Sequence, residues 1–302
     1  MSTSYHVAVI GLGAMGMGAA RSCLRAGLTT YGIDLSEQAR SQLQQAGAAA
    51  VMADARPLAE TLDAVLLLVV NATQVRRILL GEEGLARHLK PGTAIMVSST
   101  IAAEEASALA AELAQLGLQM LDAPVSGGAI KADAGEMTVM AAGSDAAFDK
   151  LAPVLDAVAG KLYRVGSEPG QGSTVKIIHQ LLAGVHIAVA AEAMALASRA
   201  GVPLDLMYDV VTHAAGNSWM FENRMPRVLT GDYQARSAVD IFVKDLTLVA
   251  DTAKALRFPL PLASTALNMF LSASNAGHGQ EDDSAVIKTF SGITLPGQEE
   301  RP

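Results

Sequence analysis

The chain has little of what marks secreted or nucleic-acid-binding proteins. It contains one cysteine in 302 residues, so no disulfide can form within it. Cys23 lies among apolar residues of an expected helix and has no nearby base, so we expect a buried thiol, not a nucleophile. Lysine and arginine total 22 against 30 acidic residues, a net charge of −8, and no basic run occurs. This balance argues against a nucleic-acid partner.

Long apolar runs are also lacking. The longest uninterrupted one, residues 64–70, is far shorter than the roughly 20 residues of a membrane-spanning helix. Residues 1–4 show no basic start, and no apolar signal region follows them. We therefore expect a cytoplasmic protein with no membrane span. The hydrophobic fraction of 51% predicts a globular protein, and the length predicts two domains.

The first domain, expected at residues 1–166, alternates short apolar runs with helical-period segments, a pattern typical of parallel strands joined by crossover helices. It predicts an α/β domain with a doubly wound, mainly parallel sheet. The expected strands are 7–10, 29–33, 65–70, 94–98, 119–122, 138–142 and 162–165. The expected helices are 14–26, 37–46, 102–116 and 146–158, with C-cap glycines at 27, 47, 117 and 160.

The second domain, expected at residues 167–302, shows no such alternation. Residues 173–200 are rich in alanine and aliphatic residues, contain no proline, and predict one long, mostly buried helix. Further helices are expected at 204–214, 220–229, 239–256 and 261–275. The second domain is therefore predicted to be all-α.

A glycine-rich loop follows the first expected strand and opens the first expected helix. Its residues are Gly11, Leu12, Gly13, Ala14, Met15 and Gly16. In this context the glycines permit a tight turn, approach of a pyrophosphate and close helix packing. Asp34 ends the next strand, where a carboxylate can hold ribose hydroxyls. It could also cap the helix at 37, a role that would not exclude the first. With no arginine directly beside it, Asp34 favours NAD over NADP.

Two further segments indicate chemistry. Residues 122–128 (Asp-Ala-Pro-Val-Ser-Gly-Gly) follow a strand, where backbone N–H groups can bind a carboxylate, although a structural turn explains them equally well. Residues 170–176 end in Lys176, and Gln180 lies four residues on, on the same helix face. A lysine in an apolar helix suits proton transfer if buried, and is an ordinary surface residue if not.

These motifs, together with Lys244-Asp245-Leu246, resemble those of the β-hydroxyacid dehydrogenase family, which includes 3-hydroxyisobutyrate dehydrogenases and tartronate semialdehyde reductases. The resemblance spans essentially the whole chain. It implies a Rossmann domain, a helical domain hung on the long helix, and an active site between them. It assigns Lys176 as general acid/base and Ser126, Gly127 and Gly128 to the substrate carboxylate. The expected cofactor residues also include Val69, Val70, Asn71, Thr100 and Lys244, although Lys244 could simply pair with Asp245.

The chain departs from the family pattern at informative positions. His179 and Gln180 replace a usual Asn-Asn pair, and Val70 replaces a proline. With residues 215–221, these changes resemble the subgroup that acts on four-carbon sugar acids. The implied reaction is NAD-dependent oxidation of the C2 hydroxyl of L-threonate to 2-oxo-tetronate. His179, Gln180, Asn217 and Ser218 are the candidate contacts to the substrate.

Other functions remain open from sequence. A zinc enzyme could use His179 and His186, seven residues apart, but no third ligand with metal-type spacing appears, so no metal is expected. A non-catalytic NAD-sensing module could share this fold. Within the enzyme reading, 3-hydroxyisobutyrate or tartronate semialdehyde are alternative substrates. The apolar second half and the family resemblance both indicate a homodimer or homotetramer.

Overall fold

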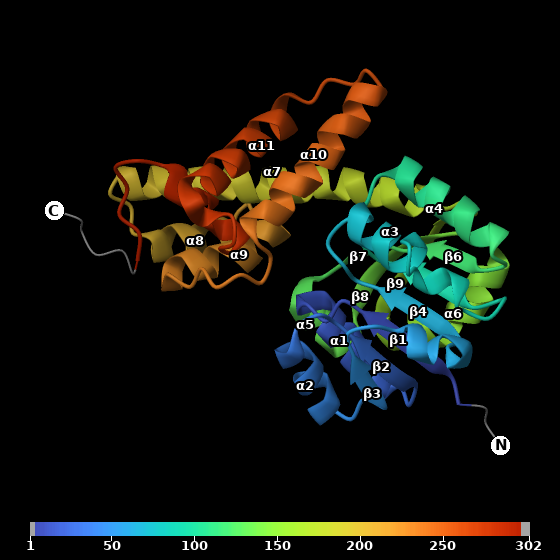
Figure 1. Cartoon of the computed structure of the whole chain (residues 1–302). Coiled ribbons are helices and arrows are strands. Elements are labelled where there is room, and N and C mark those ends of the chain that lie inside the picture. Colours follow the sequence, from blue (N-terminus) through green and yellow to red (C-terminus); the bar gives the residue numbers. More distant parts are fainter. Residues whose placement is uncertain (1–3, 297–302) are drawn as a thin grey trace. The chain divides into compact units, whose positions relative to one another are not determined.

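The computed structural model describes residues 4–296. The chain divides into two compact units, one ending at Lys176 and the other beginning at Ile177. Figure 1 labels the helices and strands of each. This division falls ten residues after the expected boundary, because the first turn of the long helix packs with the first unit. The assignment of cofactor binding to residues 1–166 and substrate binding to 167–302 stays a prediction.

The first unit is built on one sheet with strand order β3-β2-β1-β4-β5-β6-β8-β7, in which β9 also pairs with β8. Most neighbouring strands are parallel, whereas β8 runs antiparallel to β6 and β7, so the predicted mainly parallel sheet is confirmed. The strands are β1 (His6–Ile10), β2 (Thr29–Ile33), β3 (Ala50–Met52), β4 (Ala64–Leu67), β5 (Ala94–Val97), β6 (Gln119–Asp122), β7 (Val125–Ser126), β8 (Met137–Ala142) and β9 (Ala159–Gly166).

Helices cover both faces of this sheet. They are α1 (Ala14–Arg25), α2 (Glu37–Gln45), α3 (Ala72–Leu80), α4 (Ala103–Gln115), α5 (Gly128–Ala134) and α6 (Asp145–Val158), with short 3₁₀ turns at Arg56–Thr61 and Leu85–Arg87. Successive side chains of a strand point to opposite faces. Val7 and Val9 accordingly join the core under α1 and α6, whereas Ala8 and Ile10 join the core under α3 and α4. The doubly wound arrangement is therefore confirmed.

The second unit is helical, as predicted. The long helix α7 (Gln171–Arg199) runs into it, followed by α8 (Leu204–Thr212), α9 (Trp219–Thr230), α10 (Val239–Ala255), α11 (Pro261–Ala273) and short turns at Ser274–His278 and Asp283–Thr289. Aliphatic and aromatic side chains of these helices form one core that includes Met194, Phe242 and Phe270. By length and composition α7 could cross a membrane, but half of the apolar window is buried in the fold, as in a core helix of a globular protein.

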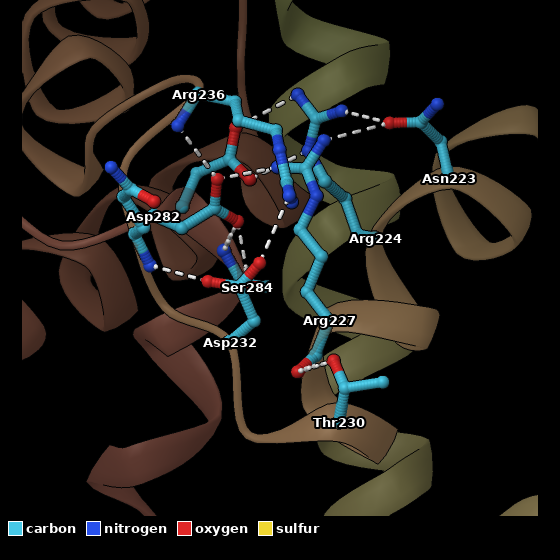
Figure 2. Close-up of polar contacts among 10 residues, drawn as sticks. Asn223, Arg224, Arg227, Thr230, Asp232, Arg236, Asp282 and Ser284 are labelled. Carbon is cyan, nitrogen blue, oxygen red and sulfur yellow. Dashed lines mark hydrogen bonds and ion pairs between the residues drawn. The ribbon is translucent and has the colours of Figure 1, made fainter.

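A network of ion pairs and hydrogen bonds connects the turn at Asp283–Thr289 to α9. Figure 2 shows Arg224, Arg227 and Arg236 gathered around Asp282 and Ser284. Arg224 also donates two hydrogen bonds to the buried Asp283, at 2.6 and 2.9 Å. Burial acts to raise the pKa of Asp282, but the hydrogen bonds from Arg227 and Ser284 outweigh it and hold this pKa below its ordinary value.

Some sequence expectations fail locally. The strand expected at 65–70 ends at Leu67, because the Val70 N–H bonds the side chain of Gln74 and the chain leaves the sheet. Glycines 27, 47 and 117 follow helices with positive φ, as C-cap glycines do, whereas Gly160 lies inside β9 against the backbone of Glu136. The sequence analysis did not find β3, β7, α3 or α5.

Candidate active site

The glycine loop combines two tightly packed positions with one open position. A Cβ on Gly11 would lie 2.7 Å from the Leu68 carbonyl oxygen, and Gly11 has a φ of +91° that disfavours other residues. A Cβ on Gly16 would lie only 1.7 Å from the Gly11 carbonyl oxygen. A Cβ on Gly13, in contrast, would meet no atom outside the neighbouring backbone within 4 Å. The loop therefore has a backbone that a ligand can approach at Gly13, directly before α1.

Asp34 joins this loop to the end of β2. One carboxylate oxygen accepts the Leu12 N–H at 2.7 Å, and the other accepts the Ser36 N–H at 2.7 Å. The helix at 37 is capped by Ser36, so the alternative that Asp34 is its N-cap is wrong. Each carboxylate oxygen has a second lone pair for a further donor. Arg40 donates to the Asp34 carbonyl oxygen at 2.7 Å, so an arginine does lie close to this carboxylate, although not next to it in sequence.

A cavity of about 850 Å³ opens beside the loop, within the range that small-molecule sites occupy. Five predicted cofactor residues line it: Gly11, Gly13, Asp34, Val69 and Val70. Its far wall is formed by residues 53–56 and 81–83, where Arg56 forms ion pairs with Asp54 and Glu83. Asn71 caps α3 by accepting the Gln74 N–H at 2.9 Å.

The predicted segments of the first unit meet at one edge of its sheet. Gly11, Asp34 and Leu68 each follow the carboxyl end of β1, β2 or β4. Thr100 follows β5, and Asp122 ends β6. These strands are parallel, and ligands of open α/β sheets bind outside their carboxyl ends. The sequence motifs are thus brought to the edge where such a sheet binds its ligand.

Residues 122–128, the segment assigned to the substrate carboxylate and called the carboxylate motif below, form a sharp turn after β6. Ser126 ends β7, and Gly127 and Gly128 open α5 with φ of +133° and +71°. These values lie where glycine is strongly favoured. No atom lies within 4 Å of a Cβ built on Gly128, so its backbone is approachable.

Lys176 is buried, with 6% of its surface exposed. The alternative that it is an ordinary surface lysine is therefore wrong. It lies one turn after Ser173, whose N–H and hydroxyl both donate to the buried carboxylate of Asp122, at 2.8 and 2.7 Å. Burial raises the pKa of Asp122, and hydrogen bonds from Ser173 and Gly170 only partly oppose that rise.

In the second unit, a chain of polar contacts links α7 to α10. His179 Nδ1 lies 3.0 Å from Gln180 Oε1, and Gln180 Nε2 donates to Asp245 at 2.5 Å. The other Asp245 oxygen pairs with Lys244 at 2.8 Å. The expected alternative for Lys244, an ion pair with its neighbour, is therefore present. It does not exclude a second contact, because an ammonium carries three donors.

Asn217 and Ser218 precede α9. Ser218 caps this helix by accepting the Phe221 N–H at 3.1 Å, and Asn217 donates to Glu222. Each thus has a local structural partner. Among residues 4–296, no group of three histidine, cysteine or acidic side chains is arranged to hold a metal ion.

Comparison with known proteins agrees with this arrangement. Residues 6–166 match the NAD binding domain of 6-phosphogluconate dehydrogenase, and residues 170–290 match the NAD-binding region of NADP-dependent 3-hydroxyisobutyrate dehydrogenase. The L-threonate dehydrogenase of Escherichia coli O6:H1 is 73% identical over 295 residues, covering 98% of both chains. The chain belongs to the 3-hydroxyisobutyrate dehydrogenase-related family of β-hydroxyacid dehydrogenases.

Solved structures of related proteins share the whole fold with this dehydrogenase. A 3-hydroxyisobutyrate dehydrogenase from Salmonella typhimurium is 70% identical, with a TM-score of 0.92, covering 95% of this chain and 100% of that one. Psf3, solved with NADP⁺, is 26% identical with a TM-score of 0.87, covering 94% and 100%. The predicted family, enzyme class and nicotinamide dinucleotide cofactor are confirmed.

The sequence analysis of this dehydrogenase missed the connecting side chains. Asp122 and Asp245 were noticed only as parts of motifs, although each is buried and each binds a predicted site residue or its helical turn. The sequence did contain a signal for both. An aspartate inside an otherwise apolar segment needs hydrogen-bond or ion-pair partners if it is buried, so each could have been expected to bind another polar group. Arg40 was overlooked because it lies six residues beyond Asp34.

Proposed function

We propose that this dehydrogenase oxidises the C2 hydroxyl of L-threonate to 2-oxo-tetronate, with NAD as the hydride acceptor. The burial of Lys176 at the end of the unit that contains the glycine loop supports this proposal most directly. The high identity over nearly the whole chain to an L-threonate dehydrogenase supports the choice of acid. The related 3-hydroxyisobutyrate dehydrogenase is the reason for testing a branched acid alongside it.

The residues present fit a dinucleotide. The open backbone at Gly13, beside the N-terminus of α1, suits a pyrophosphate, because unpaired N–H groups and the helix dipole favour negative charge there. Asp34 retains lone pairs for the ribose hydroxyls and repels a 2′-phosphate. The hydroxyls of Ser98 and Ser99, buried after β5, have no hydrogen-bond partner within residues 4–296 and leave donors for a ligand at this edge.

Within this proposal, the chain's own residues bind the acid and move one proton. Backbone N–H groups of Gly127 and Gly128, with the Ser126 hydroxyl, bind the substrate carboxylate. The deprotonated amine of Lys176 accepts the C2 hydroxyl proton as the C2–H bond breaks and the carbonyl forms. A bound nicotinamide would supply the acceptor for the hydride that leaves C2. Thr100 and Lys244 are assigned to the cofactor, and His179, Gln180, Asn217 and Ser218 to the substrate hydroxyls.

The test is an NADH-absorbance screen against L-threonate, D-threonate, D-erythronate, 3-hydroxyisobutyrate and glycerate, with NAD and NADP in parallel. We expect turnover with L-threonate and NAD. Lys176→Ala should lower kcat by about 10²–10⁴-fold, the range for losing a general acid/base, and leave NAD affinity unchanged. Turnover only with 3-hydroxyisobutyrate would refute the substrate. Unchanged turnover in Lys176→Ala would refute the proton-transfer role.

We also propose that the dehydrogenase forms a homodimer or homotetramer. Within the second unit, α7 exposes an apolar stripe at successive spacings of four, seven and seven residues: Ile178, Leu182, Val189 and Leu196 are 53–68% exposed. Leu206 and Val210 of α8 are each 52% exposed. A repeat of this kind packs well against a second helix. Light scattering of the purified protein tests this, and Leu182→Glu with Val189→Glu should give monomers; a monomeric parent protein would refute it.

A further inference from the structure

The contacts between the end of β6 and the start of α7 connect the two segments assigned to the reaction, residues 122–128 and residues 170–176. Asp122 is the last residue of β6 and lies four residues before Ser126. Its carboxylate, with no exposed surface, accepts the Gly170 N–H at 2.7 Å and the Ser173 N–H at 2.8 Å on one oxygen. The other oxygen accepts the Ser173 hydroxyl at 2.7 Å. One side chain thus binds the helical turn that precedes Lys176.

Close packing fixes the same turn independently. A Cβ on Gly172 would lie 2.5 Å from the Asp122 carbonyl oxygen and 2.7 Å from that of Met140, so α7 begins in direct contact with β6 and β8. Gly170, with a φ of +104°, lies equally close to α4, where a Cβ would be 2.5 Å from the Ser107 hydroxyl. Ser107 in turn donates to the Pro169 carbonyl oxygen at 2.7 Å. The first turn of α7 therefore has little freedom to move against the sheet.

We propose that Asp122 is a positioning residue for Lys176, holding the first turn of α7 at the sheet edge where the carboxylate motif begins. Residues 173 and 176 are one helical turn apart, so any shift of Ser173 is carried to the Lys176 backbone. Ser126 is attached to the same aspartate through three intervening residues. Asp122 thereby sets the distance between the proton acceptor and the loop assigned to the substrate carboxylate. This inference rests on the proposed role of Lys176.

A carboxylate suits this position better than a neutral side chain. It accepts three hydrogen bonds, and both of its oxygens face donors. The start of a helix favours negative charge, which offsets part of the cost of burying the charge. Asparagine keeps one accepting oxygen for the two N–H groups and presents its amide to the Ser173 hydroxyl, so it conserves the shape of the junction.

The test compares Asp122→Ala, Asp122→Asn, Ser173→Ala and Gly172→Ala with the parent enzyme. Asp145→Ala is the matched control, because its carboxylate is 95% exposed in the first turn of another helix of the same unit. Hydrogen exchange is measured for peptides covering 172–177. Kinetics are measured with NAD and with L-threonate carrying hydrogen or deuterium at C2.

We expect Asp122→Ala to speed exchange in 172–177 and to lower kcat by about 10–100-fold, the size of effect that a misplacement near 1 Å produces. The isotope effect on kcat should rise while NAD affinity stays within about twofold. Asp122→Asn should restore most of kcat. If Asp122→Ala fails to fold, Ser173→Ala, which removes one of the three hydrogen bonds, should show the same pattern more weakly. Gly172→Ala should show it through displacement of the turn by its Cβ, and Asp145→Ala should show none of it.

A lower melting temperature, with kcat per folded molecule and the isotope effect unchanged, would overturn the proposal and leave Asp122 a stabilising residue only. If the parent enzyme oxidises none of the acids, the proposed function fails. The positioning claim is then judged by exchange alone, and unchanged exchange in 172–177 of Asp122→Ala would overturn it.

Discussion

Gly13 and Gly16 of the cofactor loop should differ in how much stability they lose on the same substitution to alanine. A Cβ on Gly16 meets the Gly11 carbonyl oxygen at 1.7 Å, so the loop must move by more than 1 Å to accept alanine. Overpacking of this kind costs about 1–3 kcal/mol, and we expect the upper end because the obstacle is backbone. Gly13 has a φ of −69°, and a Cβ added there would meet no atom outside the neighbouring backbone within 4 Å, so alanine should cost at most about 1 kcal/mol, the scale of an N-cap change.

The effect on NAD binding separates the two variants further. If the pyrophosphate lies against Gly13, an added methyl group overlaps the ligand alone, and a penalty of about 1–3 kcal/mol raises the NAD dissociation constant roughly 5- to 150-fold. Gly13→Ala should thus be stable but defective in binding, whereas Gly16→Ala should be defective in both. Differential scanning calorimetry and isothermal titration with NAD measure the two quantities.

The control for this pair is Gly216→Ala in the second unit, where an added Cβ also meets nothing within 4 Å. It should change neither stability nor NAD affinity. Normal NAD affinity in Gly13→Ala would refute the placement of the pyrophosphate. Normal stability in Gly16→Ala would refute the close contact with Gly11.

Three further substitutions test other parts of the molecule. Asp34→Ala should shift the ratio of kcat/KM for NADP over NAD upward by about 10–100-fold, the worth of a charged hydrogen bond, and an unchanged ratio would contradict its role in cofactor choice. Asp282→Ala should lower the free energy of unfolding at pH 7 by about 3–5 kcal/mol, because the guanidinium of Arg227, only 11% exposed, loses its carboxylate partner. Because the folded-state pKa of Asp282 is lowered, this difference should shrink in denaturant titrations as the pH falls below 3.8, and a constant difference would contradict it. Gln180→Asn should raise KM for L-threonate about 10-fold or more, because one methylene is worth about 1–3 kcal/mol in a pocket. It should leave the pH dependence of kcat unchanged. An altered pH dependence would contradict a role limited to the substrate.

The sequence predicted those parts of the fold that local patterns encode. Parallel strands such as β1 and β5 are short apolar runs, and their positions agree with prediction to within a residue. The edge strand β3 has only three residues, none of them fully buried, and its short apolar run is rich in alanine, which gives no clear strand signal. Helix α5, of seven residues, is too short to show a period. Helix α3 does bury Ala72, Val75 and Leu79 at helical spacing, so this signal was present and overlooked.

The residues of the candidate site likewise differ in whether a local sequence pattern predicts them. The sequence predicted Gly11 to Gly16 because they form one contiguous motif, and Asp34 because it lies at a fixed spacing from that motif. The partners of Asp122 lie 48 and 51 residues away, and Gln180 and Asp245 are 65 apart. No local period links such pairs, because the fold alone brings them together. A burial argument was available for each aspartate, but it could not name the partner.

The division of the chain has a consequence for how substrate choice can change. The glycine loop, Asp34, the Ser126–Gly128 motif and Lys176 all belong to the first unit, where one sheet edge and the Asp122 junction hold them. The polar residues of the second unit, from His179 to Lys244, are held by a separate set of contacts. On the assignments proposed above, substitutions of His179 or Gln180 should alter which acid is accepted without disturbing the contacts that hold the turn before Lys176.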